Sequence, residues 1–455
     1  MAAISASPDR VFPSEPSAQP DATPASWYGL AVLIAVALYS VVDRQVFVLM
    51  AEPIRVSMGL NDFQLGLLNG LGVSLFAAIG GYPIGWLADR YDRRIVLAGC
   101  IVVWSLAVVA CGLAQSFPAL LLASAMVGAG EASIVPIMFS MIPELFRNAK
   151  RRFANSLNMV VGRLSTGLLI AFCGLLSQIA EASRPYLPAA LQGMENWRLT
   201  FFWAALPAPL FVLLLLWLPV RGRAMEVTAA VLDHPAPPDN LGILPFLRAN
   251  GTSLGVILAA LTLTTMGLTA VSVWLPVVAI RQFGATPPQV ANALGLAMFV
   301  AAAMGMLFTV YGMRWMAPRV GSRLPVIALA LASATSGLAL LPLPFASSMN
   351  GLFIIYGLHM IFLMMGIMTY PTVLQELAPA HLRARMFAIF GVVSIVFPSM
   401  MPPLVGALAD HFNQLPNSLL IVTAACSAIL LLLSAALFVW GARRYEDTVR
   451  AAAHA

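Results

Sequence analysis

Apolar segments long enough to cross a lipid bilayer recur about twelve times along this chain. A helix rises ~1.5 Å per residue, so roughly 20 apolar residues span the hydrocarbon core. The mean hydropathy of +0.88 is far above that of soluble proteins. We therefore predict an all-α integral membrane protein, with spans near residues 27–50, 63–88, 95–114, 117–142, 153–180, 197–219, 253–280, 288–313, 324–345, 350–376, 386–409 and 417–441.

The 25 Lys and Arg residues are divided unevenly between the predicted loops. Most lie in alternate loops, in segments such as RYDRR, RNAKRR and RRYEDTVR, whereas the other loops hold Arg55, Arg184, Arg198 and Arg281. Because basic loops stay on the cytoplasmic side, we predict a multi-pass protein of the cell inner (plasma) membrane with both termini cytoplasmic. The arginines are scattered along the membrane edges, so the pI near 9.4 indicates no nucleic-acid partner.

Residues 220–252 combine charges and prolines and divide the spans six and six. The two sets echo each other, because PELFRNAKRRFANSL matches LQELAPAHLRARMFAIF, with Glu144 and Arg151 spaced as Glu376 and Arg383 are. Such repeats are expected of a duplicated transporter fold. We predict a disordered cytoplasmic N-terminal tail (1–26), two six-helix bundles (27–219 and 253–441), a cytoplasmic central loop (220–252) and a cytoplasmic C-terminal tail (442–455).

The sequence GWLADRYDRR, residues 85–94, lies between the second and third spans. It resembles the GxxxDRxGRR signature of the major facilitator superfamily, and with the spans and the repeat this resemblance covers nearly the whole chain. It implies the major facilitator fold of two pseudo-symmetric six-helix bundles, in which this loop latches the bundles together in the outward-open state. The resemblance assigns this conformational latch to Gly85, Asp89, Arg90, Arg93 and Arg94, with Glu144, Arg151, Glu376 and Arg383 after spans four and ten.

The latch departs from the family pattern at two places. Asp92 stands where the family usually has Gly, and because Asp tolerates a left-handed conformation better than most residues, we expect the turn to survive. The second copy, YGMRWMAPRVGSR, has no acidic residue, so we expect a one-sided latch.

The motif GAGEAS, residues 128–133, together with the pair Asp43–Arg44, resembles the spinster branch of the superfamily. Members of that branch move sphingolipid-like and other amphipathic lipids. They commonly carry an Arg about a turn before the motif, whereas LLASAM contains none here.

Five ionisable side chains fall inside predicted spans: Asp43, Arg44, Glu131, Arg163 and His359. Each would cost several kcal/mol facing lipid, so we expect a bundle interior or a wet cavity around them. Counting ~1.5 Å per residue places Glu131 and Arg163 at one depth on adjacent spans. We therefore expect Arg163 to neutralise Glu131 in place of the missing arginine, either as a structural ion pair or within a charge-regulated cavity.

Asp43 and Arg44 are neighbours, so their side chains project about 100° apart and cannot face one partner. The first span lines the central cavity in this fold, and we expect Asp43 to take and release a proton there, with Glu131 as its partner in the cycle. Arg44 then contacts another helix, holds an anionic substrate group or snorkels to the outer interface.

The remaining candidate residues are polar groups within spans. His359 is open to two interpretations, a hydrogen-bonded packing residue or a proton relay, and a lone histidine in a span is more often the first. The residues that offer hydrogen bonds to a substrate headgroup are Tyr39, Asn69, Asn158, Tyr356 and Tyr370. The glycines and prolines of GLLNGLGVSLFAAIGGYPIG and FPSMMPPLVGA predict kinked or tightly packed helices in spans two and eleven.

These features predict a secondary active transporter, proton-coupled, that moves an amphipathic organic anion or lysolipid-like substrate by alternating access. A proton-coupled small organic acid importer or drug exporter is the alternative within this class, and a non-transporting receptor or scaffold is the alternative from another. The sequence contains no Walker-type motif and no catalytic or metal-ligand constellation, so we expect no enzyme activity, cofactor or metal. The expected partners are the lipid bilayer, the substrate and protons, and we expect a monomer.

Overall fold

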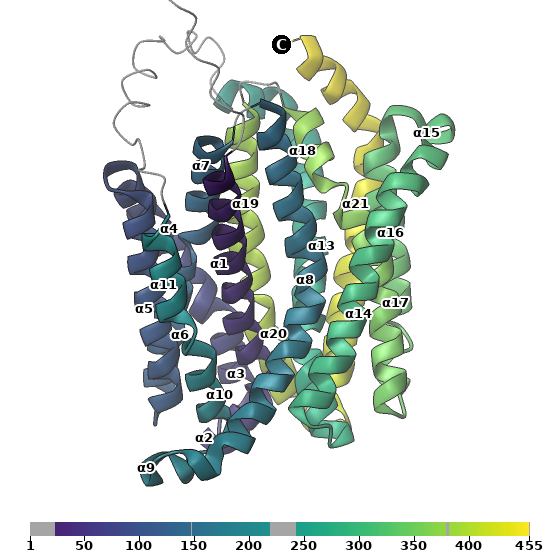
Figure 1. Ribbon diagram of the computed structural model, residues 1–455. Coiled ribbons are helices and arrows are strands. Elements are labelled where there is room, and N and C mark those ends of the chain that lie inside the picture. Colours follow the sequence, from purple (N-terminus) through teal and green to yellow (C-terminus); the bar gives the residue numbers. More distant parts are fainter. Residues whose placement is uncertain (1–22, 147, 219–242, 379–381, 455) are drawn as a thin grey trace, which may run out of the picture.

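The computed structural model describes residues 23–146, 148–218, 243–378 and 382–454, which form an almost entirely helical molecule (Figure 1). Eleven of its helical segments are long and apolar enough to span a membrane. One of them, Pro287–Phe345, has 59 residues and bends back near Gly321–Arg323, so it supplies two crossings. The predicted all-α membrane fold is confirmed.

The N-terminal half packs α1 against α7, α8 and α10, while α6 lies against α4 and α5. Fully buried Val36, Ile101 and Trp104 belong to its core. Its elements are α1 (Pro24–Leu49), α2 (Ala51–Met58), α3 (Asp62–Asn69), α4 (Leu71–Arg90), α5 (Arg93–Leu113), α6 (Phe117–Glu131), α7 (Ile134–Leu145), α8 (Asn148–Ser183), η1 (Arg184–Tyr186), α9 (Ala189–Gln192), α10 (Asn196–Ala205) and α11 (Ala208–Leu216).

The C-terminal half is built around α21, which packs against α13 and α16, while α17 packs against α14 and α16. Its elements are α13 (Ile243–Phe283), α14 (Pro287–Leu307), η2 (Phe308–Gly312), α15 (Met313–Val320), η3 (Gly321–Arg323), α16 (Leu324–Ala339), η4 (Leu343–Phe345), α17 (Met349–Ile367), α18 (Tyr370–Leu377), α19 (Arg383–Ser399), α20 (Met401–His411) and α21 (Ser418–His454).

The two halves meet along two seams, α8 against α14 and α3–α4 against α19–α20. Small residues permit a backbone approach there, because a Cβ on Gly167 would lie 2.4 Å from the Gly295 carbonyl oxygen. On the second seam, a Cβ on Gly66 would lie 2.4 Å from the Pro402 carbonyl oxygen. The glycines therefore set how closely the halves approach.

Several crossings are broken near their middle. Span two is divided at Gly70 (φ −120°, ψ −100°) into α3 and α4, and span eleven is divided at Met400 into α19 and α20. These are the two spans for which glycine and proline predicted kinks, and the kinks are confirmed. Span four is also divided, since α6 ends at Glu131 and α7 begins at Ile134.

Element ends differ from the expected boundaries at two places. Helix α13 begins at Ile243, so its first turns occupy residues predicted as the central loop. Helix α21 continues to His454, through residues predicted as a C-terminal tail. Residues 1–22 and 219–242, which hold most of the predicted N-terminal tail and central loop, lie outside the described residues.

Candidate functional site

A cavity of about 780 Å³ lies between the two halves. Helices α1, α4, α6, α7 and α8 line it from one side, and α13, α14, α17 and α19 line it from the other. Most of its wall is apolar, and the charged side chains on that wall are Arg44 and Glu131. The cavity is thus a largely apolar chamber with one ion pair.

Arg44 reaches from α1 to the end of α6, where its Nη2 donates to Glu131 Oε2 at 2.8 Å. The Glu131 side chain is 3% exposed, whereas that of Arg44 is 63% exposed. The buried carboxylate therefore has a partner, and the guanidinium keeps donors directed away from that partner. Of the three roles expected for Arg44, the structure shows contact with another helix, α6.

Two glycines of GAGEAS place Glu131 at this wall. A Cβ on Gly128 would lie 2.2 Å from the Val73 carbonyl oxygen of α4, and one on Gly130 would lie 2.7 Å from Cβ of Trp104 on α5. Only glycine lets α6 settle so closely between these two helices. The carboxylate at the end of α6 then reaches the cavity.

The expected pairing of Arg163 with Glu131 is wrong. Arg163 is exposed on α8, and Glu131 is paired with Arg44 instead. Depth along the helices is only one coordinate, because the rotation of each helix about its axis also decides which side chains meet. Arg163 comes one turn before Gly167 on α8, which contacts Gly295 of α14, and it is not among the residues that line the cavity.

Asp43 points away from the cavity into the N-terminal half. It is 1% exposed, and Trp104 Nε1 donates to its Oδ2 at 3.1 Å. Among the described residues Asp43 Oδ1 has no hydrogen-bond partner. The expectation that Asp43 borders the cavity is therefore wrong, because α1 turns Arg44 toward the cavity and Asp43 toward α5.

The other predicted polar residues are divided between the cavity and the helix cores. Asn69 and Tyr356 line the cavity, and the Tyr356 hydroxyl lies 3.4 Å from Ser272 Oγ. Tyr39 is buried in the N-terminal half, with its hydroxyl 3.3 Å from Ser105 Oγ. Two more are removed from the cavity wall: Asn158, which is buried on α8, and Tyr370, whose ring tilts against Phe390.

His359 is fully buried in the C-terminal half. Its Nδ1 lies 2.7 Å from Ser336 Oγ, while Nε2 has no partner among the described residues. Nearby, Thr264 Oγ1 lies 2.7 Å from Ser434 Oγ and 3.4 Å from Ser333 Oγ. Among the described residues of this half, the buried polar side chains are hydroxyl groups and one imidazole.

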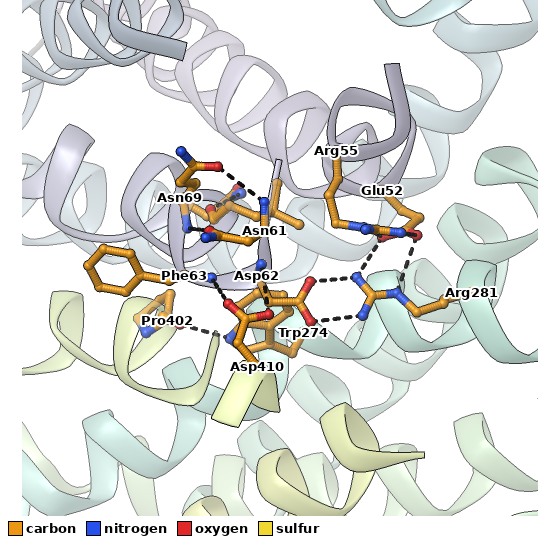
Figure 2. Close-up of polar contacts among 12 residues, drawn as sticks. Glu52, Arg55, Asn61, Asp62, Phe63, Asn69, Trp274, Arg281, Pro402 and Asp410 are labelled. Carbon is orange, nitrogen blue, oxygen red and sulfur yellow. Dashed lines mark hydrogen bonds and ion pairs between the residues drawn. The ribbon is translucent and has the colours of Figure 1, made fainter. Parts of the chain in front are cut away.

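A charge cluster joins the halves at the end of the molecule that holds α2 (Figure 2). Arg281 of α13 donates to both Asp62 oxygens at 2.8 and 2.7 Å, and to both Glu52 oxygens at 3.2 and 2.9 Å. Across the second seam, Asp410 accepts from the backbone N–H groups of Asp62 at 3.2 Å and Phe63 at 2.9 Å. The cavity is therefore closed toward the α2 end.

The sequence did not identify this cluster, since its members are far apart in the chain and resemble ordinary loop charges. One signal was available: Arg281 is among the few arginines predicted in the outer loops. An arginine that the charge rule does not explain needs another reason to be there.

At the end of the molecule that holds α15, opposite α2, the latch residues of the first motif copy form contacts within the N-terminal half. Arg93 pairs with Glu144, and Arg94 pairs with Asp92 and donates to the Leu218 carbonyl. The remaining residues are half-buried Gly85, exposed Asp89 and Arg151, and Arg90, which lies 4.0 Å over the Trp86 ring.

The second-copy residue Glu376 accepts a hydrogen bond from Tyr445 within the C-terminal half, and the Arg383 side chain lies outside the described part of the chain.

Asp92 does not need a left-handed conformation in this turn. Its φ is −58°, and its side chain caps α5 by accepting from the Arg94 N–H at 2.9 Å. The Arg94 guanidinium holds the pKa of the Asp92 carboxyl below its usual range. The turn survives the loss of glycine because Asp serves as an N-cap. In the second copy the turn does use a glycine with positive φ, Gly321 at +66°.

Comparison with known proteins agrees with this architecture. The model of the Major Facilitator Superfamily matches residues 32–394. An MFS-type efflux pump of Mycolicibacterium smegmatis is 27% identical over 255 residues, which are 53% of this chain and 56% of that protein. The 3-(3-hydroxy-phenyl)propionate transporter of Escherichia coli K12 is 28% identical over 284 residues, 61% of this chain and 62% of that one. These alignments span between about half and two thirds of the relatives' length.

Solved structures give a fuller overlap. The crystal structure of a bacterial homolog of the human lysosomal transporter Spinster, inward-facing and unoccupied, has a TM-score of 0.71 at 22% identity and covers 94% of this chain and 98% of that one. The expected resemblance to the spinster branch is confirmed at the level of the fold.

Proposed function

Because the chain belongs to the Major Facilitator Superfamily, we propose that it is a proton-coupled secondary transporter for an amphipathic organic anion or lysolipid-like molecule. One observation carries the proposal: the largely apolar cavity between the halves exposes a single cation, Arg44. An apolar wall favours a hydrocarbon chain, and a guanidinium with free donors binds a carboxylate or phosphate with two parallel hydrogen bonds. A cavity of about 780 Å³ is of the size that holds a drug-sized ligand.

The Arg44–Glu131 pair supplies a route to proton coupling. A substrate anion on Arg44 competes with Glu131 for the same guanidinium, which weakens the stabilisation of the buried carboxylate. Glu131 then takes up a proton, and it releases that proton when the substrate leaves and Arg44 returns. Substrate and proton thus bind together, with one proton on Glu131 for each anionic charge on Arg44.

Asp43 holds a second proton in this proposal. It is buried behind the cavity wall, and Trp104 lies between it and the end of α6, touching Asp43 with the indole N–H and packing its Cβ against Gly130. Protonation of Glu131 therefore affects Asp43 through charge and through the packing of Trp104, and not through direct contact with the substrate.

A small organic acid importer or a drug exporter is the second candidate, and the names of two relatives favour it. One is called an efflux pump and the other a 3-(3-hydroxy-phenyl)propionate transporter. In both candidate functions Arg44 binds the anionic group of the substrate. The two substrates differ in how much apolar surface they place against the cavity wall.

We further propose that the α2 end faces outward and both termini lie in the cytoplasm, because the end near α15 is rich in arginine. The structure then corresponds to an inward-facing transporter. In the outward-open state, the loop at residues 85–94 would contact the C-terminal half and serve as the latch.

Uptake into proteoliposomes that contain the purified chain tests the proposal. We expect an acyl-chain phosphate, such as a lysophosphatidic acid, to be taken up faster with a proton gradient than without one. The comparison substrate is 3-(3-hydroxyphenyl)propionate, which would be preferred if the second candidate is right. Uptake of every tested anion that ignores the proton gradient would refute the coupling.

Two arginine variants locate the anion site. Arg44→Gln removes the cavity cation, and we expect it to abolish uptake. The double variant Arg44→Gln with Glu131→Gln should also lack uptake but should retain the melting temperature of the unmodified protein. Arg163→Gln removes the other mid-span arginine, which does not line the cavity, and we expect it to keep most of the uptake. The reverse pattern would assign the anion to Arg163.

A further inference from the structure

Two arginines compete for one carboxylate in the cluster at the α2 end (Figure 2). Arg55 lies one turn after Glu52 on α2, and its Nε and Nη2 donate to the Glu52 oxygens at 2.9 and 2.7 Å. Arg281 approaches the same carboxylate from α13, in the other half of the molecule. Glu52 is therefore held once from within its own half and once from across the interface.

Asp62 is in a different position. Among the described residues its carboxylate is paired with Arg281 alone, through two hydrogen bonds across the interface. The Asp62 side chain is 9% exposed and that of Glu52 is 6% exposed, so both carboxylates depend on a cation while the interface is closed.

The neighbouring charges reinforce the contact between the halves. Asp410 of α20 accepts from the first N–H groups of α3, where a helix N-terminus favours an anion. That helix also has a cap of its own, because Asn61 Oδ1 accepts from the Gln64 N–H at 2.8 Å. His411, next along α20, is exposed. If the halves separate here, α3 keeps its local cap and loses Asp410.

We propose that Arg281 is a gating residue and that Arg55 alone keeps Glu52 neutralised when the gate opens. The inference rests on alternating access between the two halves. In the closed state Arg281 neutralises Glu52 and Asp62 together. In the open state Arg55 still neutralises Glu52 from the same helix, so opening leaves only Asp62 and Arg281 to be hydrated. Arg281 stabilises the closed state, whereas Arg55 stabilises the open one.

This division predicts effects of opposite sign for two arginines that share a carboxylate. Arg281→Gln removes the ion pairs that Glu52 and Asp62 make across the interface, while the Asp410 bonds to the α3 backbone remain. We expect the open population to increase about tenfold or more. Arg281→Lys restores a cation and should recover part of the closed population. Arg55→Gln takes the partner of Glu52 away from the open state, and we expect the open population to decrease roughly threefold.

Spin-label distances measure these populations without any substrate. Cysteines introduced by Val56→Cys on α2 and Asn413→Cys after α20, in a chain whose four native cysteines are replaced, place one exposed label on each half. Double electron–electron resonance on the protein in lipid nanodiscs then reports short and long distances. Asp62→Asn should raise the long-distance, open population. Arg55→Gln is therefore tested in the Asp62→Asn background, where the closed and open populations are both large enough to measure.

Arg184→Gln is the matched control. Arg184 pairs with Glu181 within the N-terminal half, so its loss should not change the distance distribution. Melting curves establish that each variant is folded. The gate is refuted if Arg55→Gln and Arg281→Gln move the populations in the same direction, or if Arg281→Gln leaves them unchanged.

The outcome is separable from that of the proposed function. If the distances respond as expected while no tested anion is taken up, the gate stands and the substrate assignment fails. If uptake depends on Arg44 while the distances ignore Arg281, the reverse holds.

Discussion

The two halves of the molecule share a helical plan and differ in what they bury at mid-span. The N-terminal half holds the Arg44–Glu131 ion pair and, behind it, the carboxylate of Asp43. The C-terminal half holds neutral hydrogen bonds between hydroxyl groups, such as Thr264 with Ser434, and the imidazole of His359 against Ser336. Charge chemistry is thus concentrated in one half.

This difference indicates how the halves divide the work. Arg44 and Glu131 belong to the same half, so their bond does not have to break when the halves tilt against each other. The charges that must separate during a tilt are those of Arg281 with Glu52 and Asp62, at one end. The chemistry of the cavity and the opening of the gate therefore use different ion pairs.

The largest expected effect comes from breaking the N-terminal pair. Arg44→Gln leaves Glu131 buried without a cation, which should cost about 1–3 kcal/mol of stability, besides abolishing uptake. Adding Glu131→Gln removes the stranded carboxylate and should recover the melting temperature without recovering transport. If the double variant transports normally, the pair is structural and the halves do not differ in function.

The next effect tests the carboxylate behind the pair. Trp104→Phe keeps one aromatic ring and removes the N–H that donates to Asp43, and we expect a loss of about 1–3 kcal/mol. Trp197→Phe is the matched control, since the buried Trp197 Nε1 has no hydrogen-bond partner among the described residues. Thermal unfolding of both variants makes the comparison. Equal losses would show that ring packing, and not the Asp43 hydrogen bond, stabilises this site.

A smaller effect is expected in the C-terminal half. His359→Leu removes an imidazole with one unpartnered nitrogen, and Ser336 Oγ can still donate to the carbonyl of residue 359, 3.3 Å away. We expect stability to change by less than about 1 kcal/mol, and the dependence of uptake on external pH to be unchanged. A shift in the pH dependence of uptake would instead indicate that His359 carries a proton. Proton chemistry would then occur in both halves.

The smallest effect concerns the turns that follow spans two and eight. The low pKa of Asp92 means that its carboxylate stabilises the N-terminal turn above the usual Asp range, and that this contribution is lost as the pH falls through the folded-state pKa. The equivalent turn contains Gly321 and no carboxylate. Between neutral pH and about pH 3, protection against hydrogen exchange, relative to the intrinsic rate at each pH, should therefore fall more at residues 91–97 than at residues 320–326. Asp92→Asn should abolish the difference.

The helices could be predicted from the sequence because the bilayer fixes their length. Apolar runs of about 20 residues identify a crossing wherever they occur, and the glycines and prolines of spans two and eleven identified two of the breaks. The ends of α13 and α21 could not be predicted in this way, since those residues lie beyond the apolar runs and polar sequence does not specify where a helix stops.

The site could be predicted in its members but not in its pairing. Asp43, Arg44 and Glu131 stood out because charges are costly within a span. Their partners depend on rotation about each helix axis, which apolar sequence does not constrain, and so Arg163 was placed beside Glu131 where Arg44 lies. The gate could not be predicted for another reason. Its residues lie at span ends, where charged side chains are common: Glu52, Asp62 and Arg281.

The contact between Gly167 and Gly295 has a mechanical consequence. The backbones of α8 and α14 approach closely there because neither of these two residues has a side chain. Two rigid bodies that meet at such a point tilt about it as about a fulcrum, and the ends move in opposite senses. Any bulk added there, as in Gly167→Val, acts as a wedge at the fulcrum and separates the halves at both ends together.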